Sequence, residues 1–352
     1  MNLVLNLTEH CNLRCSYCYY RTSPQVSVMT KATLEQAIDF AFARMQFLKQ
    51  NWLNITFFGG EPLLEAELMM YGVHYAKSRA PQGMRLQFAI NTNGTLLTEN
   101  ILDFLQQQHF RIYLSLDGPQ SVHDLQRPCK DGTSSWASIA PWIPRLRALD
   151  TLVIRVIDRR HLENIASSIE WIYEQGLVMM TTAINYDGGW TDVDWQTLES
   201  QYRLMGLFWM QAKKSGQRLQ IGTFQDKIRL ELEKRTCKTS SCEIGNGALA
   251  VSVHGELFPC TRFVNNDIHN HWKIGTLEQG LQQEKLTEIA KYLHTDKVEC
   301  QECSIRNRCH GNGCACIAFS TTGGIWEVSP EVCAHERMIT EISDELALEL
   351  LS

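Results

Sequence analysis

Residues 11–18 read CNLRCSYC, so three cysteines, Cys11, Cys15 and Cys18, are spaced C-x3-C-x2-C near the start of the chain. Three thiolates on so short a segment can bind three irons of a [4Fe–4S] cluster and leave the fourth iron without a protein ligand. A zinc knuckle is the alternative for closely spaced cysteines. The spacing therefore predicts a cluster with one open coordination position, where chemistry can take place.

Composition narrows the classes of protein to consider. The 352 residues are 44% hydrophobic, and the formal net charge is -6 without a long basic run, which argues against a nucleic-acid partner. No apolar run is long enough to span a membrane, and the N-terminus lacks the features of a signal peptide, so we expect a cytoplasmic protein with no membrane partner. In a reducing compartment, the 13 cysteines are expected to bind metal rather than form disulfides.

Short apolar runs alternate with longer segments of helical period over the first two thirds of the chain. The predicted strands are residues 2–7, 53–58, 86–91, 111–116, 151–157 and 178–184. The predicted helices are residues 31–48, 63–78, 99–108, 136–148, 162–174 and 194–214. Repeated strand-then-helix order implies parallel strands joined by right-handed crossovers. The pattern predicts an α/β fold, either a barrel or a doubly wound sheet.

The polar stretch at residues 213–217 marks a change in composition. Four cysteines precede it and nine follow it. We therefore predict one domain over residues 1–215 and a cysteine-rich domain over residues 216–352. Within the second domain, residues 248–253 and 256–258 are predicted to form a hairpin that turns at His254-Gly255.

Polar motifs follow the second, third and fourth predicted strands. In chain order their residues are Gly59, Gly60, Glu61 and Pro62, then Asn93, then Ser115 and Asp117. Because the carboxyl ends of parallel strands meet at one face, we expect these motifs to lie beside the cysteines. Glycines allow close backbone approach, and proline suits the first turn of a helix. A plain strand-to-helix turn would explain the glycines and Pro62 but not Glu61.

Together the cysteines and these motifs resemble the radical S-adenosylmethionine (SAM) superfamily. The resemblance implies a partial (β/α)6 TIM-like barrel, in which SAM chelates the open iron and an electron from the cluster splits the sulfonium. It implies SAM contacts from Tyr17, Gly59, Gly60, Glu61, Pro62, Asn93, Ser115, Asp117 and Arg127. Glu61 is expected to accept from the SAM amino group. Arg127 is expected to pair with the SAM carboxylate, with a surface salt bridge as its alternative.

The later cysteines resemble the SPASM extension of radical SAM enzymes, which carries two auxiliary [4Fe–4S] clusters. The resemblance implies Cys237, Cys242, Cys260 and Cys314 as ligands of the first auxiliary cluster, and Cys300, Cys303, Cys309 and Cys333 as ligands of the second. Four residues, rather than the more usual three, separate Cys309 from Cys314, so Cys316 is a rival to Cys314. Structural zinc is the alternative for these spacings. Cys129 fits none of them and is expected to be a buried thiol.

Members of this family mostly modify peptides or proteins. We predict a peptide maturase, in which a 5′-deoxyadenosyl radical takes a hydrogen atom from a ribosomally made precursor peptide and a carbon–carbon (cyclophane-type) or thioether crosslink forms. The alternative is an anaerobic sulfatase-maturing enzyme, which makes formylglycine. In the pattern typical of that class, an aspartate directly follows the cysteine that corresponds to Cys260. This chain has Thr261 there instead. A non-enzymatic iron–sulfur or zinc protein that binds a partner is the third reading.

Substrate contacts and partners complete the predictions. The candidate catalytic residues are Tyr186, Asp187 and Arg262, and Trp190 is a further candidate contact; loop packing or a solvated charge is the alternative for each. The expected partners are the precursor peptide and a reductant such as flavodoxin or ferredoxin. Because the chain begins directly with a strand, leader recognition is expected to use a separate leader-binding protein, the barrel surface or the second domain.

Overall fold

The computed structural model describes residues 1–20, 27–237, 244, 247–264 and 269–351. The chain forms two compact units, each assembled from segments that are far apart in sequence. The first unit comprises Met1–Ser115, Arg127–Thr151 and Ile244–Ala290, and the second comprises Leu116–Gln126, Leu152–Glu243 and Lys291–Ser352.

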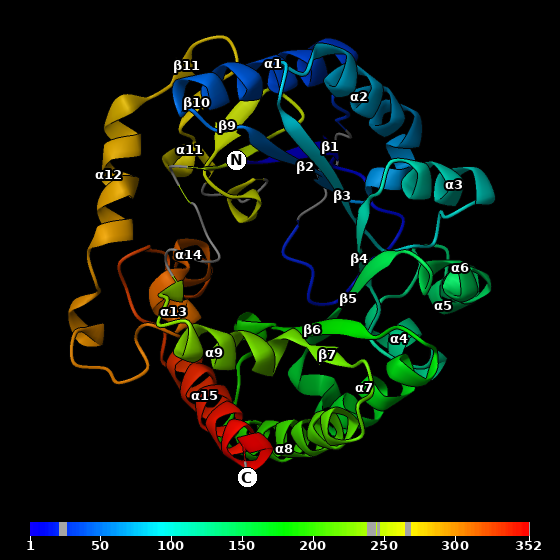
Figure 1. Cartoon of the computed structure of the whole chain (residues 1–352), viewed down its shortest axis with the longest axis vertical. Coiled ribbons are helices and arrows are strands. Elements are labelled where there is room, and N and C mark those ends of the chain that lie inside the picture. The colour runs from blue at the N-terminus through cyan, green and yellow to red at the C-terminus, as the bar shows by residue number, and fades with distance from the viewer. Residues whose placement is uncertain (21–26, 238–243, 245–246, 265–268, 352) are drawn as a thin grey trace. The chain divides into compact units, whose positions relative to one another are not determined.

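Four parallel strands form the centre of the first unit (Figure 1). They are β1 (Asn2–Thr8), β2 (Trp52–Gly59), β3 (Arg85–Thr92) and β4 (Arg111–Ser115). They lie side by side in chain order, with Leu5 opposite Phe57 and Phe57 opposite Ile90. The corresponding predictions are confirmed to within about one residue at each end. These strands could be predicted from the sequence because their inner residues are apolar and their side chains are buried.

Short strands extend this sheet beyond β1. They are β8 (Ala248–Val251), β9 (Glu256–Phe258), β10 (Gly275–Thr276) and β11 (Gly280–Leu281). β8 pairs with β1 in parallel, and β9 returns antiparallel to β8 through a turn in which Gly255 has φ +78°. The predicted hairpin is confirmed, although its first strand ends at Val251 rather than at residue 253.

Helices follow the strands of the first unit. They are α1 (Lys31–Phe47), η1 (Pro62–Glu65), α2 (Ala66–Arg79), α3 (Glu99–Gln107), α5 (Ser135–Ile139), η2 (Ala140–Trp142), α6 (Ile143–Leu146), η5 (Thr261–Phe263) and α11 (His269–Trp272). Thr30 and Thr98 cap α1 and α3 with their hydroxyl oxygens. The helix predicted over 136–148 is confirmed in its position, but it is divided into α5, η2 and α6, because Pro141 and Pro144 lack the N–H that a continuous α-helix needs.

The second unit holds β5 (Asp150–Ile157), whose first two residues belong to the first unit, followed by β6 (Met179–Ile184) and β7 (Gln220–Ile221). These strands are parallel, in the order β5-β6-β7. The helices here are α4 (Gln120–Gln126), η3 (Arg159–Asn164), α7 (Ile165–Glu174), η4 (Tyr186–Gly188), α8 (Asp192–Lys214), α9 (Gly222–Leu232), η6 (Val298–Cys300), α13 (His310–Gly313), α14 (Ala315–Thr322) and α15 (Pro330–Leu351). α12 (Gln283–His294) begins in the first unit and ends in the second.

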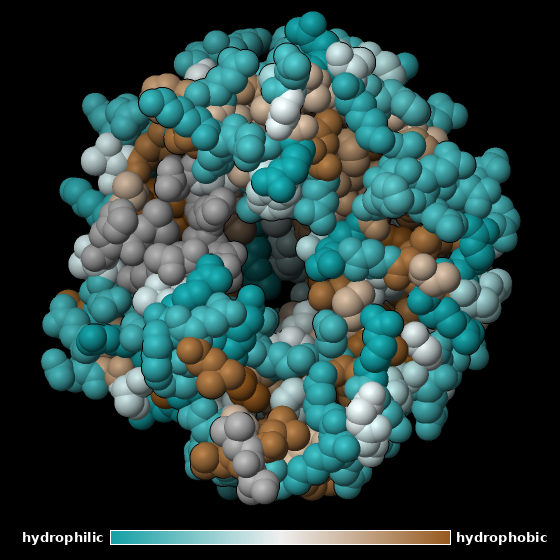
Figure 2. Space-filling view, in the orientation of Figure 1, coloured by the Kyte–Doolittle hydropathy of each residue, from teal (hydrophilic) through white to brown (hydrophobic). Residues whose placement is uncertain are grey.

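The face drawn in Figure 2 is mostly hydrophilic. Hydrophobic side chains appear around the C-terminal end of α15, where Leu348 is 69% exposed. No helix in the described part of the chain combines the length and the apolar character that crossing a bilayer requires.

A buried ion pair joins α9 to α15 in the second unit. Lys227 Nζ lies 2.6 Å from Glu336 Oε2, and the two side chains are 3% and 2% exposed. The ammonium also donates to the carbonyl of Arg308 at 2.6 Å, and Glu336 accepts from the backbone N–H of His310 at 2.6 Å. Burial alone would raise the pKa of Glu336, but Lys227, with His310 and His335, lowers it to about 2. The Glu336 carboxylate therefore stays charged in the interior.

Removing Lys227 should destabilise the second unit much more than removing an exposed lysine. Lys227→Met leaves the Glu336 carboxylate buried without its counter-ion, which costs about 3–5 kcal/mol. Lys234→Met breaks an exposed pair with Glu231, worth at most about 1 kcal/mol. Urea unfolding of both variants measures the difference. Lys227→Met combined with Glu336→Leu should recover most of the loss, whereas similar losses for the two single lysine variants would contradict the prediction.

Candidate functional site

The cysteine loop after β1 is held by a segment far away in sequence. Leu13 forms an isolated antiparallel bridge with Cys129. The N–H of Arg14 donates to the Pro128 carbonyl, and the N–H of Lys130 to the Asn12 carbonyl, both at 3.0 Å. Cys129 is 6% exposed, as expected for a buried thiol. These contacts fix the backbone between the first two cysteines of the loop.

The paired glycines after β2 bring a second loop against the first. The N–H of Gly60 donates to the Thr8 carbonyl at 2.9 Å, and that of Glu61 to the His10 carbonyl at 2.7 Å. A Cβ on Gly60 would lie 2.0 Å from the His10 oxygen, and one on Gly59, whose φ is +133°, 2.4 Å from the Thr8 oxygen. Only glycine permits this approach. The backbone that the glycines accommodate is that of the cysteine loop.

The Glu61 carboxylate connects this loop to the end of β3. It is 1% exposed; Oε1 accepts from the Leu63 N–H at 3.0 Å and the Thr92 hydroxyl at 2.7 Å, and Oε2 accepts from the Asn93 N–H at 2.7 Å. Burial raises the pKa of Glu61 to about 7, and these hydrogen bonds limit the rise. A carboxylate offers about four lone-pair sites, so capacity for one further donor remains.

Asn93 completes a chain of contacts back to the cysteines. Its Nδ2 donates to Asn12 Oδ1 at 2.9 Å and lies 3.9 Å from Cys11 Sγ, which also accepts from the Leu13 N–H at 3.4 Å. Burial raises the pKa of the Cys11 thiol to about 11, with the Leu13 N–H acting in the opposite direction. Such a thiol gives up its proton when a metal binds. The donors around it suit a metal-bound thiolate.

Two arginines lie over the tyrosines on either side of Cys18. The guanidinium carbon of Arg127 is 5.3 Å from the ring centroid of Tyr17, and that of Arg262 is 4.7 Å from the centroid of Tyr19. Arg127 is 6% exposed, which does not suit the alternative of a surface salt bridge. Burial raises the pKa of the Cys18 thiol, and Arg127 is among the groups that oppose the rise. Two arginine side chains therefore lie beside this part of the loop.

Pro62 begins η1, and two further predicted SAM contacts lie at the end of β4. Ser115 is partly buried in the first unit, while Asp117 is fully buried in the second. Asp117 Oδ1 accepts from the Val156 N–H at 3.0 Å, and its carbonyl accepts from Arg155 Nε at 2.9 Å. These contacts give Asp117 a structural role at β5. Its contact with SAM stays a prediction.

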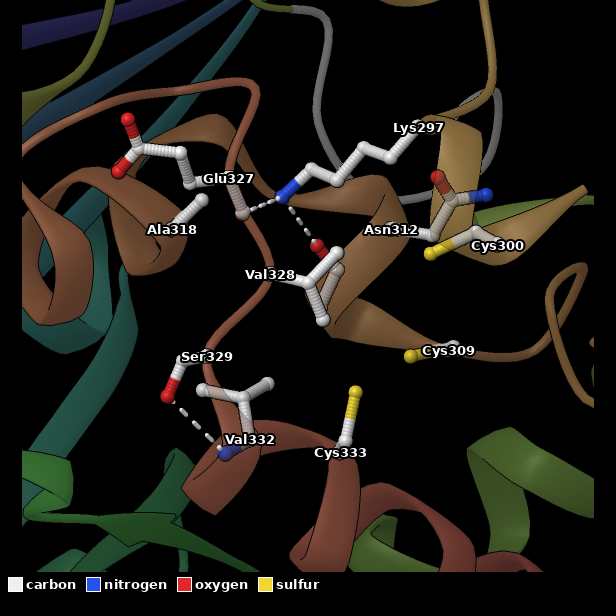
Figure 3. A pocket seen from close by; sticks show the side chains of 11 residues that line it. Lys297, Cys300, Cys309, Asn312, Ala318, Glu327, Val328, Ser329, Val332 and Cys333 are labelled. Atoms are coloured by element: carbon white, nitrogen blue, oxygen red, sulfur yellow. Dashed lines mark hydrogen bonds between the residues drawn. The ribbon is translucent and has the colours of Figure 1, made fainter.

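A pocket in the second unit is lined by cysteines (Figure 3). The sulfur atoms of Cys300, Cys309 and Cys333 point into a common space. Burial raises the pKa of all three thiols, and the charge of a Cys303 thiolate would raise those of Cys300 and Cys333 further. The four predicted ligands of the second auxiliary cluster are thus near one another. Among the described residues, no three Cys, His, Asp or Glu side chains are arranged to hold a single metal ion.

The predicted ligands of the first auxiliary cluster are distributed over both units. Cys260 precedes η5 in the first unit, Cys237 and Cys314 belong to the second, and Cys242 lies outside the described residues. Cys237 is 1% exposed, and its sulfur lies 3.1 Å from His310 Nδ1. The sulfurs of Cys314 and Cys316 are 3.2 Å apart, so the two rival ligands lie side by side and the distance does not favour either of them.

The predicted substrate contacts after β6 lie in the second unit. Tyr186 and Asp187 belong to η4, and Trp190 stacks on Trp195 with centroids 4.6 Å apart. The Tyr186 hydroxyl lies 2.9 Å from His335 Nδ1, and His335 Nε2 lies 3.0 Å from the Tyr202 hydroxyl. Burial lowers the pKa of His335 to about 4, so its imidazole is neutral.

Sequence reasoning missed three side chains that support these sites. Asn12 lies within the cysteine motif, and this position could have indicated that its side chain supports the site. His335 follows Cys333 by two residues, and Lys297 precedes Cys300 by three. No local pattern indicated that either side chain is buried.

Comparison with known proteins gives a consistent result. Residues 5–199 match the family described as the Radical SAM superfamily. The serine-type anaerobic sulfatase-maturating enzyme of Klebsiella aerogenes is 28% identical over 326 residues, which cover 86% of this chain and 76% of that protein. The structure of anSMEcpe with bound AdoMet has a TM-score of 0.82 at 20% identity, covering 100% of this chain and 99% of that one. Streptococcus suis SuiB bound to precursor peptide SuiA has a TM-score of 0.62 at 16% identity, covering 94% and 75%.

The structural likenesses show the fold over essentially the whole chain and confirm the predicted α/β partial barrel with a C-terminal extension. The family match covers more than half of the residues, including the cysteine loop and the loops after β2 and β3. On this evidence, the chain belongs to the radical SAM superfamily.

Proposed function

We propose that this chain is a radical SAM/SPASM oxidoreductase that modifies a peptide. The observation that carries the proposal is the cysteine loop, with three cysteines, a backbone N–H directed at Cys11 Sγ and an arginine beside Cys18. Membership of the superfamily implies a [4Fe–4S] cluster and SAM. When bound, they supply a 5′-deoxyadenosyl radical that takes a hydrogen atom from the substrate.

The first unit provides residues to hold and orient SAM. Cys11, Cys15 and Cys18 would bind three irons of the cluster. Arg127 would pair with the SAM carboxylate, because its planar guanidinium suits bidentate contact and its position beside Tyr17 is buried. Glu61 retains capacity for one donor and would accept from the SAM amino group. The remaining proposed contacts are those of Gly59, Gly60, Pro62, Asn93, Ser115 and Asp117.

We further propose that residues 216–352 carry two auxiliary [4Fe–4S] clusters with the ligand sets predicted above. The pocket lined by Cys300, Cys309 and Cys333 supports the second of these clusters. Structural zinc is the alternative for these cysteines, and iron and sulfide analysis of the purified protein distinguishes the two. On this proposal residues 1–215 hold SAM, and the cysteine-rich part accepts an electron from the substrate.

We propose a ribosomally made peptide as the substrate and a crosslink as the product. Peptide binding is supported by the likeness of the fold to SuiB, which was solved with a precursor peptide. The residue after Cys260 is Thr261, whose hydroxyl lies 3.3 Å from Asn6 Oδ1. A neutral residue therefore stands where sulfatase-maturing enzymes are expected to have an aspartate.

Tyr186, Asp187 and Arg262 are the proposed substrate contacts. Flavodoxin or ferredoxin would supply electrons, and a separate protein could present the leader peptide.

Formylglycine formation is the second candidate function. It is favoured by the similarity to the Klebsiella aerogenes enzyme, which extends over 86% of this chain. The two candidates share radical generation and differ in the product. A crosslink leaves no aldehyde, whereas formylglycine is an aldehyde that reacts with hydrazides.

Replacing Cys11, Cys15 and Cys18 together with Ala should abolish formation of 5′-deoxyadenosine. Iron should fall by about a third, because one cluster of three is lost and the other ligands belong to other segments. Iron analysis and chromatography of the reduced protein with SAM provide the measurements. Cys129→Ala is the matched control, since it removes a buried thiol from the segment beside the loop. Persistent 5′-deoxyadenosine in the triple variant would refute the assignment.

Glu61→Gln should weaken SAM binding and leave the iron content unchanged. The amide keeps the size of the side chain but removes its negative charge, so the charge-assisted hydrogen bond proposed between Glu61 and the SAM amino group is lost. Such a bond is worth about 1.5–3 kcal/mol, or roughly ten- to a hundredfold in affinity. Equilibrium binding of SAM to the anaerobic protein tests this. Glu67→Gln is the matched control at an exposed position of α2, and it should bind SAM like the wild type. If the wild type and both variants bind SAM with equal affinity, Glu61 does not contact SAM and only stabilises the turn.

Cys303→Ala should separate SAM cleavage from product formation. The cluster of the first unit would still cleave SAM, while the missing electron acceptor would stop the modification. The enzyme is incubated with SAM, a reductant and a short peptide encoded beside its gene, or with a sulfatase peptide containing Cys or Ser. 5′-Deoxyadenosine and modified peptide are measured together.

Circular dichroism verifies that Cys303→Ala is folded. Tandem mass spectrometry identifies a crosslink, and a hydrazide probe detects formylglycine. A hydrazide-reactive sulfatase peptide would replace the crosslinking proposal with the second candidate. Full modification by a folded variant that lacks the cluster would exclude an electron-accepting role for these cysteines.

A further inference from the structure

A buried lysine lines the cysteine pocket of the second unit. Lys297 is 3% exposed and stands directly before η6, three residues before Cys300. Its Nζ donates to the Gly311 carbonyl at 3.0 Å and to the Glu327 carbonyl at 2.6 Å, so it is anchored to two different segments (Figure 3). The lysine and three of the four proposed ligands of the second auxiliary cluster share one cavity.

Buried lysines are rare, because taking an ammonium out of water costs several kcal/mol. Two carbonyl oxygens accept hydrogen bonds from the Lys297 ammonium, and its Nζ also lies 5.9 Å from the centroid of the Tyr292 ring. A bound cluster with four thiolate ligands is an anion, and in this pocket it would lie beside the positive charge of Lys297.

The ammonium lies on the same pocket as the proposed sulfur ligands. Lys297, Cys300 and Cys333 all line it. These cysteines come from different elements, η6 and α15.

We propose that Lys297 raises the reduction potential of the cluster bound by Cys300, Cys303, Cys309 and Cys333, and so makes it a better electron acceptor. Reduction adds one negative charge to the cluster, and a positive charge in a poorly screened interior stabilises the reduced form more than the oxidised form. Lys297 is therefore a tuning residue that contacts the cofactor pocket and not the peptide. The proposal rests on the second auxiliary cluster of the proposed function.

The test is a potentiometric titration followed by electron paramagnetic resonance. All variants are made in the Cys11, Cys15 and Cys18→Ala background, so that only auxiliary clusters contribute. The signal of the second cluster is the one that disappears in Cys303→Ala. Lys297→Gln should make its reduction at least tenfold less favourable, which is about 59 mV for a one-electron couple. Lys297→Arg keeps the charge and should stay near the parent potential.

Lys291→Gln is the matched control, because it removes an exposed lysine of α12 and should leave the potential unchanged. An unchanged potential in Lys297→Gln with full iron content, or an equal shift in Lys297→Arg, would overturn the proposal. If Lys297→Gln binds no second cluster, Lys297→Met is examined too. Loss of the cluster in both neutral variants with retention in Lys297→Arg supports a role of the charge, and loss in all three overturns it.

A failure of the proposed function has a different signature. If Cys303→Ala keeps every signal and all of its iron, these cysteines do not bind a cluster. That result would refute the second auxiliary cluster itself rather than the effect of Lys297 on its potential.

Discussion

The candidate SAM site depends on one close contact between two backbones. The loop after β2 lies so near the loop after β1 that residues 59 and 60 have no room for a side chain. This contact places Glu61 where it can accept hydrogen bonds from the end of β3, and it places Asn93 beside Cys11. A shift of the glycine loop would therefore disturb the carboxylate, the asparagine and the cysteine together.

The parallel strands could be predicted because each is a run of apolar residues between turn signals, and the cysteine and Gly-Gly-Glu-Pro motifs could be placed because they end those strands. β7, β10 and β11 could not, since two residues carry no periodic pattern. Partners distant in sequence were also beyond reach. Nothing in residues 128–130 indicates that they pair with the cysteine loop, and nothing near Tyr186 indicates its contact with His335.

The two buried lysines of the second unit show why burial alone does not define a role. Lys227 faces Glu336, so its charge is balanced by a carboxylate and mainly joins α9 to α15. Lys297 donates to carbonyl oxygens and lines a pocket of thiols. The first arrangement serves structure. The second places a positively charged side chain on the pocket that the cysteines line.

The pairing of β1 with β8 has a consequence for the order in which the protein is assembled. The neighbour of β1 on one side, β8, ends at Val251, and Asn6 Nδ2 donates to the Val251 carbonyl at 2.9 Å. Contacts so distant in sequence form slowly, because a long loop must close first. The sheet of the first unit therefore cannot be completed before residues 248–251 have been synthesised, although the segments that hold the cysteine loop all lie before residue 131.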